Sequence, residues 1–330
     1  MPIILGIESS CDDTAAAVLK DGSILSNVIA NQQIHEQYGG VVPELAARAH
    51  LQNIVPVVDQ ALAQANIDKK DLHAVAYTLG PGLVGSLLVG NSFAKSLAIS
   101  LNIPLIEVNH MQAHLLVHFE KDLPQPKFPF LGLTVSGGHT QLVLVEDIDQ
   151  MKVIGETLDD AVGEAFDKAG KMLGLPYPSG PSIDRFAKKG VARIDFAKPK
   201  VSDLNFSFSG LKTSILYHLR AKQKEDSQYI ANNLNDLCAS VQTTIVSIVI
   251  EKLISAVKQT GITEIALGGG VSANSELRNA LMANKEWNVY LPPLSLTTDN
   301  AAMIALAGAF KFEKGNFGQL HSHAQSRMSF

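Results

Sequence analysis

Cysteine and an excess of positive charge are what this sequence of 330 residues has least of. It contains two cysteines, Cys11 and Cys238, which are too few for a disulfide framework or for a cysteine-based zinc site. We therefore expect a reducing compartment, the cytoplasm. The formal net charge of −5 excludes a protein that binds nucleic acid through bulk positive charge. Any nucleic-acid site has to be a local patch.

Long apolar runs are also missing. The N-terminal residues 1–8 lack a basic region, and their apolar stretch is too short for a signal peptide. The most apolar later stretch, residues 241–257, is interrupted by Gln242, Glu251 and Lys252, whereas a membrane span needs about 20 largely apolar residues. We predict a buried helix there and no contact with a membrane.

Strand-like and helix-like segments alternate along the chain, which predicts an α/β fold. The length suggests about two domains, and a hydrophobic content of 46% is typical of a globular protein. We expect strands at 3–7, 14–19, 24–29, 72–78, 103–108, 130–135, 140–146, 153–157 and 264–267. We expect helices at 44–65, 83–101, 110–119, 160–173, 233–260, 274–283 and 300–311.

The opening pattern of strand, polar turn and strand returns later in the chain. The first polar turn begins near Glu8 and the second near Ser136, about 128 residues later, and helices follow both. A proline-rich stretch, residues 123–130, precedes the second copy and is typical of a linker. This repeat at domain scale predicts two related halves.

Three turns that follow predicted strands have the composition of phosphate-binding loops. They are residues 6–14 (GIESSCDDT), 135–140 (VSGGHT) and 266–274 (ALGGGVSAN). Hydroxyl groups and free backbone amides can hold a phosphate, and glycine lets the backbone approach a ligand because it lacks Cβ. Each turn alone is also compatible with an ordinary hairpin or helix cap. Three together favour nucleotide binding.

His110 and His114 are spaced to lie on one face of a helix, where they can share a metal ion. Two surface histidines are the alternative. A zinc-protease motif would carry a glutamate as general base at the second position, which Met111 occupies here. Asp299, at the start of a predicted helix, is a candidate third ligand.

Acidic residues are spaced along the predicted helix 160–173. Asp160, Glu164 and Asp167 fall at i, i+4 and i+7 and are expected on one face, either as a solvated surface or as part of a site. The next segment, residues 177–184, contains two prolines and a glycine and is predicted to be a stiff loop that lines a pocket.

A basic segment follows, between Phe186 and Lys224. It holds nine lysines and arginines against two acids, and Phe206 and Phe208 lie among them. The segment is either a solvated face or a patch for a phosphate backbone.

Together these motifs resemble the TsaD family, the bacterial tRNA threonylcarbamoyladenosine transferases, over nearly the whole chain. The motifs that carry the resemblance are 6–14 (GIESSCDDT), 80–83 (GPGL), 109–114 (NHMQAH), 135–140 (VSGGHT), 160–170 (DAVGEAFDKAG), 268–271 (GGGV) and 298–300 (TDN). The resemblance implies the actin–hexokinase–chaperone ATPase-like fold, with two related lobes around a nucleotide cleft. We expect an N-terminal lobe of residues 1–128 plus a C-terminal helix of about 305–330, and a C-terminal lobe of residues 129–304.

The resemblance also implies a reaction. The threonylcarbamoyl group passes from threonylcarbamoyl-AMP to N6 of the adenine next to the anticodon, in tRNAs that read codons starting with A, and AMP is released. By the same resemblance, His110, His114 and Asp299 hold one metal ion, Fe²⁺ or Zn²⁺. The residues implied in binding the adenylate are Val135, Ser136, Gly137, Gly138, His139, Asp167, Gly180, Asp184 and Asn274. Asp12 or Asp13 is placed to act as a base or to orient the amine.

Partners known for the family are a small non-catalytic paralogue, TsaB-like, and a P-loop ATPase, TsaE-like; alone, the chain is expected to pair with a second copy. Three other functions remain as alternatives: a small-molecule kinase of the same superfold, a metalloprotease and a non-catalytic nucleotide-binding scaffold. The histidine pair has no role in a magnesium–ATP kinase, and Met111 leaves a protease without its base.

Overall fold

The computed structural model describes residues 2–330, and their contacts divide the chain into two units. Unit 1 is built from the chain up to Gln125 together with Pro292–Phe330, and unit 2 is Pro126–Leu291. The chain therefore returns to unit 1 at Pro292 and not at about 305. The reason is that the whole last helix and the loop before it pack within unit 1.

Unit 1 contains a five-stranded sheet in the order β3-β2-β1-β4-β5. Its strands are β1 (Ile3–Glu8), β2 (Thr14–Lys20), β3 (Ser23–Ala30), β4 (Ala74–Gly80) and β5 (Leu105–Asn109). The first three form an antiparallel meander, and β4 and β5 extend it in parallel from β1. All residues of β1 and β4 are buried, as expected for central strands with helices on both faces.

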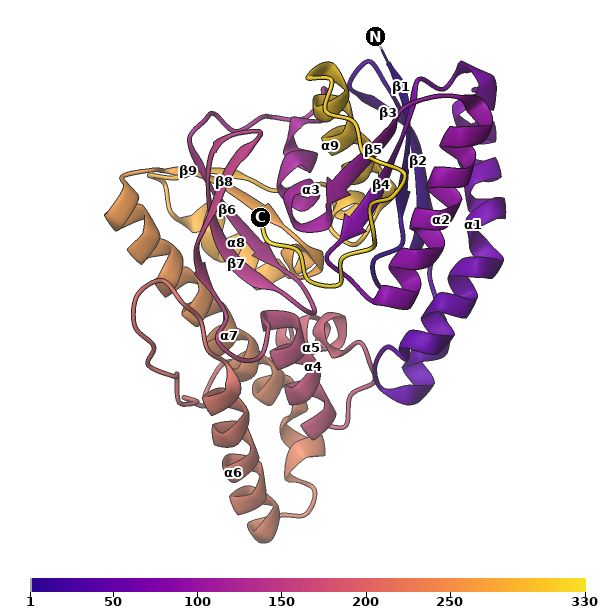
Figure 1. The fold of residues 1–330 in the computed structure, drawn as a ribbon. Coiled ribbons are helices and arrows are strands. Elements are labelled where there is room, and N and C mark those ends of the chain that lie inside the picture. Colours follow the sequence, from indigo (N-terminus) through magenta and orange to yellow (C-terminus); the bar gives the residue numbers. More distant parts are fainter. Residues whose placement is uncertain (1) are drawn as a thin grey trace. The chain divides into compact units, whose positions relative to one another are not determined.

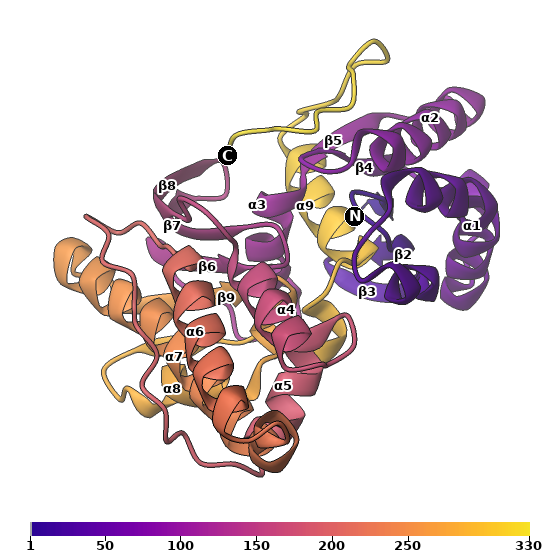
Figure 2. The same ribbon diagram turned by 90° about the horizontal axis from the view of Figure 1, so that it is seen from below.

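Four helices cover the two faces of this sheet. They are α1 (Pro43–Ala65), α2 (Val84–Leu101), α3 (His110–Leu116) and α9 (Ala301–Glu313). Figures 1 and 2 show α1 and α2 against one face, and α3 and α9 against the other. Short 3₁₀ helices in this unit span Gln33–Tyr38, Lys69–Asp71, Val117–Phe119 and Leu294–Leu296.

Unit 2 repeats the topology of unit 1. Its strands are β6 (Phe130–Val135), β7 (Thr140–Asp147), β8 (Gln150–Glu156), β9 (Glu264–Gly268) and β10 (Asn288–Tyr290), in the order β10-β9-β6-β7-β8. Again the first three strands are antiparallel, and the last two run parallel to the first. This confirms the α/β prediction and the repeat seen in the sequence.

The helices of unit 2 are α4 (Val162–Met172), α5 (Ser179–Ala187), α6 (Ser209–Glu225), α7 (Tyr229–Thr260) and α8 (Ser275–Ala283), with a 3₁₀ turn at Gly270–Ala273. The prediction of a stiff loop over residues 177–184 is wrong, because α5 begins at Ser179. Pro181 is tolerated in its first turn, where the missing N–H would have no partner within the helix.

By length and composition alone, α2 and α7 could each cross a membrane, which is weak evidence because the core helix of a soluble protein passes the same test. In α7, 67% of the most apolar window is buried within the protein. Its apolar side chains pack with α4, α5 and the sheet in the core of unit 2. The prediction of a buried helix over residues 241–257 is therefore confirmed.

Candidate active site

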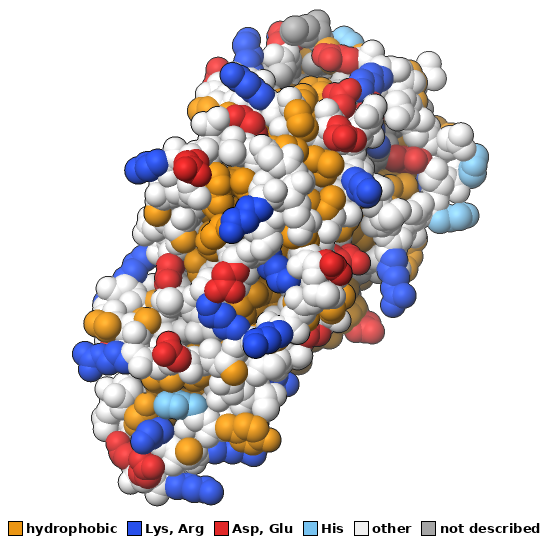
Figure 3. Space-filling model, turned by 90° about the vertical axis from the view of Figure 1, so that its left-hand side faces the viewer, with side chains coloured by type: hydrophobic (Ala, Val, Ile, Leu, Met, Phe, Trp, Pro, Cys, Tyr) orange, Lys and Arg blue, Asp and Glu red, His pale blue; other side chains and the backbone are white. Residues whose placement is uncertain are grey.

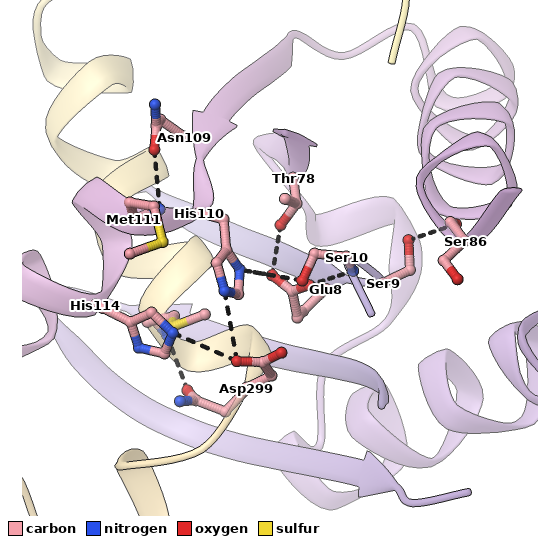
Figure 4. A network of polar contacts seen from close by, with 12 residues as sticks. Glu8, Ser9, Ser10, Thr78, Ser86, Asn109, His110, Met111, His114 and Asp299 are labelled. Carbon is pink, nitrogen blue, oxygen red and sulfur yellow. Dashed lines mark hydrogen bonds and ion pairs between the residues drawn. The ribbon is translucent and has the colours of Figure 1, made fainter. Parts of the chain in front are cut away.

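Glu8 ends the wholly buried strand β1 and anchors a polar network (Figure 4). Its carboxylate accepts hydrogen bonds from the backbone N–H of Ser10 and from the Thr78 hydroxyl, and lies 3.0 Å from Nδ1 of His110. The Ser10 hydroxyl also lies 3.2 Å from that nitrogen. The first turn thus fixes one side of the His110 ring.

The second side of the ring faces a histidine and an aspartate. His110 and His114 lie one turn apart on α3, and Asp299 precedes Asn300, the N-cap of α9. Asp299 Oδ1 lies 3.4 Å from Nε2 of His110 and 3.4 Å from Nε2 of His114. The two ring centroids are 4.7 Å apart. The structure therefore brings together the three residues that the sequence suggested as metal ligands.

Burial and neighbouring carboxylates set the charges in this cluster. Burial lowers the pKa of His110, but the Glu8 and Asp299 carboxylates outweigh it and hold that pKa well above its usual value. At His114, burial dominates and lowers the pKa, which favours the neutral imidazole that ligates metals. Asp299 is partly buried, and burial opposes its ionisation, yet His110 and His114 keep its pKa below the usual range.

The donor set fits one divalent metal ion. One ligand atom from each of the three side chains lies within 4.8 Å of the others. Nδ1 of His110 is engaged by Glu8, so its Nε2 is the nitrogen left for a metal. Within the described residues, buried His114 makes no hydrogen bond through Nδ1, and its Nε2 has only the Asp299 carboxylate, 3.4 Å away. Bonds of about 2.1 Å in tetrahedral geometry separate two ligand atoms by about 3.4 Å, the separation found for both histidine–aspartate pairs.

Asp12 and Asp13 lie in the first turn, partly buried. Asp13 accepts a hydrogen bond of 2.7 Å from the amide of Asn31. Burial, and then the charges of Asp299 and Asp12, raise the pKa of Asp13 to about 7. A carboxyl with this pKa can take up a proton near neutral pH.

The start of α2 holds the first turn in place. The N–H of Leu83 donates to the Ser10 carbonyl over 2.7 Å, and the Ser86 hydroxyl donates to the Cys11 carbonyl over 2.8 Å. A Cβ added to Gly82 would lie 2.4 Å from the Ser10 carbonyl oxygen. Glycine at position 82 is therefore required for α2 to approach this turn.

In unit 2, the turn after β6 is closed by its own hydrogen bonds. Ser136 N–H donates to the His139 carbonyl, and His139 N–H donates to the Ser136 hydroxyl. No heavy atom lies within 4 Å of where a Cβ on Gly137 or Gly138 would stand, and neither has a positive φ. Packing and backbone conformation therefore do not require glycine there, so the turn leaves open space beside its backbone.

The glycine turn after β9 lies against the end of β6. Gly269 has a φ of +88°, and a Cβ there would be 2.5 Å from the Val135 carbonyl oxygen. Asn274 caps α8 by accepting from Leu277 N–H, and its amide donates to Gln242. These contacts bring Val135 and the turn that ends at Asn274 to the same end of the sheet.

The expectation that Asp160, Glu164 and Asp167 share one helix face is wrong, because α4 begins at Val162, after Asp160. Lys168 pairs with Asp160 and Glu164. Asp167 turns to α5 instead.

Asp167 accepts a hydrogen bond of 2.7 Å from Ser179 N–H and a further one from Gly180 N–H, and burial nevertheless raises its pKa. Asp184, on α5, accepts from the Ser275 hydroxyl and pairs with Lys188. Hydrogen bonds therefore link the start of α5 to α4 and its middle to the start of α8.

In the basic segment, Phe206 and Phe208 are not available for stacking on nucleotides. Their rings stack on one another, are at most 1% exposed, and belong to the core of unit 2. Phe206 and Phe208 are two residues apart in a polar stretch. In an extended chain this spacing puts both rings on the same side, which is the sequence signal that they are buried together.

Sequence reasoning missed Glu8 and Asn109 as positioning residues. Glu8 ends an apolar strand, Ile3–Glu8, and a carboxylate buried at such a position needs a positively charged or hydrogen-bonding partner. Asn109 directly precedes His110, and asparagine before a helix is the signal of an N-cap.

The comparisons with known proteins identify the family of this chain. The family model for TsaD, described as tRNA N6-adenosine threonylcarbamoyltransferase, matches residues 23–306. A protein named tRNA N6-adenosine threonylcarbamoyltransferase from Christiangramia forsetii is 61% identical over 99% of this chain and 98% of its own. One of the same name from Riemerella anatipestifer is 56% identical over 98% and 97%.

Solved structures with low identity show the fold. Component A of the (R)-2-hydroxyglutaryl-CoA dehydratase of Acidaminococcus fermentans aligns with a TM-score of 0.55 and 16% identity, over 95% of this chain and 99% of its own. The ROK hexokinase of Thermus thermophilus aligns with a TM-score of 0.51 and 17% identity, over 95% and 100%. The predicted actin–hexokinase–chaperone ATPase-like fold is confirmed.

Family membership and the buried His–His–Asp cluster together indicate a metal centre in a tRNA-modifying transferase. The match spans both units and includes the cluster's two histidines and its aspartate. This chain belongs to the TsaD family, the tRNA N6-adenosine threonylcarbamoyltransferases.

Proposed function

We propose that this protein transfers the threonylcarbamoyl group from threonylcarbamoyl-AMP to N6 of the adenine 3′-adjacent to the anticodon, in tRNAs that read codons starting with A. AMP is the second product. The observation that carries the proposal is the buried His110–His114–Asp299 cluster in a chain that matches this family over both units.

The three clustered side chains would hold Fe²⁺, with Zn²⁺ as the alternative. Two imidazoles and one carboxylate suit either ion. When bound, the metal supplies a Lewis acid that polarises a carbonyl or binds a phosphate oxygen. Glu8 orients the His110 ring through Nδ1, the nitrogen that does not face the metal position, as carboxylates commonly do for metal-bound histidines.

The adenylate would bind unit 2 at the turn of Ser136–His139. The open space beside Gly137 and Gly138 leaves room for a phosphate next to the backbone, and backbone amides can stabilise negative charge on the reacting carbonyl. The remaining residues proposed for adenylate binding are Val135, Asp167, Gly180, Asp184 and Asn274. Two contacts support this. Asp167 accepts a hydrogen bond from Ser179 at the start of α5, and Asp184 accepts one from Ser275 at the start of α8.

The reaction replaces one bond to the carbamoyl carbon by another. N6 attacks this carbon, the bond from carbon to the phosphate oxygen breaks, and AMP leaves with the bonding electrons. N6 gives up one proton. Asp13 or Asp12 would receive this proton or orient the amine, and the raised pKa of Asp13, about 7, suits a proton acceptor near neutral pH.

Transfer RNA would contact the basic segment, residues 186–224. Figure 3 shows lysine and arginine side chains interspersed with acidic ones on this view, including at its lower end, where α6 lies. Lys188, Arg193, Lys198 and Lys222 pair with acids. The other five bases of the segment are exposed, and no ion pair with them is found among the described residues: Lys189, Lys200, Lys212, Arg220 and Lys224. They are the better candidates for phosphate contacts.

The proposal extends to partners and place of action. We expect a small TsaB-like paralogue and a TsaE-like P-loop ATPase to work with this protein in the cytoplasm, and self-pairing in their absence.

A transfer assay tests the proposed function. The purified protein, with these two partner proteins, is given threonylcarbamoyl-AMP and unmodified tRNA, and the tRNA is digested to nucleosides for mass spectrometry. We expect N6-threonylcarbamoyladenosine from the wild type and at least a hundredfold less from Asp299→Asn. The control Asp71→Asn changes an exposed aspartate that belongs to none of the proposed sites, and it should leave the yield unchanged.

Absence of the modified nucleoside, while the Christiangramia forsetii relative produces it in parallel, would refute the proposal. ATP-dependent phosphorylation of a small molecule that His110→Ala does not affect would favour a kinase.

A further inference from the structure

The last residues of the chain run along unit 1 without forming a helix or strand. After α9 the segment of residues 318–329, here the C-terminal strap, passes β5 and β4 (Figure 1). Gly318 N–H donates to the Leu105 carbonyl over 2.7 Å, and Gln319 N–H to the Glu107 carboxylate over 2.9 Å. The strap is therefore hydrogen-bonded to β5, the outermost strand of the sheet.

Further on, the strap reaches the ends of β4 and β5, where the site residues begin. Gln325 N–H donates to the Leu79 carbonyl over 2.9 Å. Lys95, on α2, donates to the Ser322 carbonyl. These bonds are made by backbone groups of the strap, so they depend on its path and not on its side chains.

The strap lies against the glycine segment that holds the first turn. A Cβ added to Gly80 would stand 2.0 Å from the Gln325 carbonyl oxygen, and Gly82 N–H donates to the Ser326 carbonyl over 3.3 Å. On its other side, Gly82 lies against Ser10, whose hydroxyl contacts His110. The strap thus supports the wall from which Ser10 and Glu8 meet the His110 ring.

A second contact leads directly to the helix of the two histidines. The Asn109 carbonyl oxygen Oδ1 accepts from Met111 N–H and Gln112 N–H and so caps α3 (Figure 4). The amide nitrogen of the same side chain donates to the Ser329 carbonyl over 2.8 Å. Because one planar amide makes both sets of bonds, the strap fixes the orientation of the cap, and the cap fixes the start of α3.

We propose that the C-terminal strap is a positioning element for the His110–His114–Asp299 site, acting through Asn109 and through Gly80–Gly82. Within the part of the chain that the structure describes, no hydrogen bond or ion pair joins the strap to His110, His114 or Asp299. Removing it leaves them in the chain but frees the start of α3 and the glycine segment. This inference rests on the proposed metal role of the cluster.

The test compares three variants with the wild type. Deletion of residues 321–330 removes the bonds of Ser322, Gln325, Ser326 and Ser329. Asn109→Asp keeps an oxygen that can cap α3 but puts a carboxylate against the Ser329 carbonyl. Arg327→Ala is the matched control, because it changes a side chain of the strap and leaves the backbone path intact.

Two properties are measured on each protein. The first is the affinity for Co²⁺, followed by the visible absorption of the bound ion. The second is the hydrogen–deuterium exchange rate of the Met111 and Gln112 amides in the metal-free protein. Melting temperature and circular dichroism exclude general unfolding.

We expect Co²⁺ to bind the deletion variant and Asn109→Asp at least tenfold more weakly than the wild type, with an altered absorption band, a loss typical for residues that orient metal ligands. The two amides should exchange at least tenfold faster in the deletion variant. Arg327→Ala should match the wild type in both. If the deletion variant does not fold, the Co²⁺ affinity and amide exchange of Asn109→Asp alone test the proposal.

Wild-type affinity and wild-type exchange in folded variants would overturn the proposal. If the wild type itself binds no Co²⁺, the proposed metal role fails. The exchange rates of the metal-free protein then decide the positioning role alone.

Discussion

At the scale of single residues, the first turn carries two carboxyls with opposite pKa shifts. Burial opposes ionisation of both Glu8 and Asp13. At Glu8 the adjacent His110 outweighs burial and lowers the pKa, whereas Asp13 faces Asp299 and Asp12, which raise its pKa further. The same turn therefore provides a permanent anion beside the metal-site histidine and a group that exchanges protons near neutral pH.

Asp13→Asn should stabilise the metal-free protein at high pH. The Asp13 carboxyl ionises near pH 4 in the unfolded chain and near pH 7 in the folded protein. The ionised form is thus disfavoured in the folded state, and stability falls as the pH rises from about 4 to about 7. We expect the variant to melt several degrees above the wild type at pH 8 and at the same temperature at pH 4. Equal melting temperatures at both pH values would contradict the assigned environment.

Gly137 and Gly269 are predicted to respond differently to alanine. Gly137→Ala meets no neighbour, so its free energy of unfolding should stay within about 0.5 kcal/mol of the wild type. Gly269→Ala combines a left-handed backbone with a clash against Val135, and should lose roughly 2 kcal/mol or more.

The affinity for a non-reactive analogue of threonylcarbamoyl-AMP tests whether the turn that contains Gly137 binds the adenylate. Gly137→Ala should weaken it at least about tenfold, because the added Cβ occupies the open space beside the turn. Calorimetry measures this affinity, and denaturant titration measures the stability. An analogue affinity equal to the wild type would remove this turn from the proposed adenylate site.

At the scale of elements, the sequence predicts most strands and helices because their apolar patterns are regular. The long apolar stretch of α7 after its non-helical residue Asn233 and the buried strand β1, which is apolar up to Glu8, leave little choice. The misses have local causes. Helix α5 was not predicted because its segment contains two prolines. Helix α6 was not predicted because lysines interrupt the apolar spacing of Leu211, Ile215 and Leu219. The proposed ligand set was predictable from spacing and resemblance. The position of Glu8 at the end of an apolar strand signals a need for a partner but does not identify His110, and the strap acts through long-range contacts that no local pattern records.

The basic segment should contribute to tRNA binding through its unpaired cations. Lys200→Glu and Arg220→Glu should each weaken tRNA binding and reduce the magnitude of its salt dependence by about one ion. Lys198→Glu should also weaken binding, although Lys198 already shares its charge with Glu251. Lys285→Glu, an equal charge change on an exposed residue outside the segment, is the control. Unchanged affinity and slope for Lys200→Glu and Arg220→Glu would exclude this segment.

At the scale of the whole molecule, the two units share one strand topology but carry different chemistry. Unit 1 turns the end of its first strand toward a histidine and carboxylate cluster, and unit 2 ends its first strand in an open glycine turn. A net charge of −5 is compatible with a tRNA enzyme because the positive charge is concentrated in one segment of unit 2. In the proposed function, unit 1 holds the metal that the transfer uses.

Metal analysis of the purified protein by mass spectrometry shows whether unit 1 binds this metal. We expect close to one iron or zinc ion per chain in the wild type, and less than a tenth of that in the double variant His110→Ala/His114→Ala, with unchanged folding by circular dichroism. An equal metal content in wild type and folded double variant would contradict it.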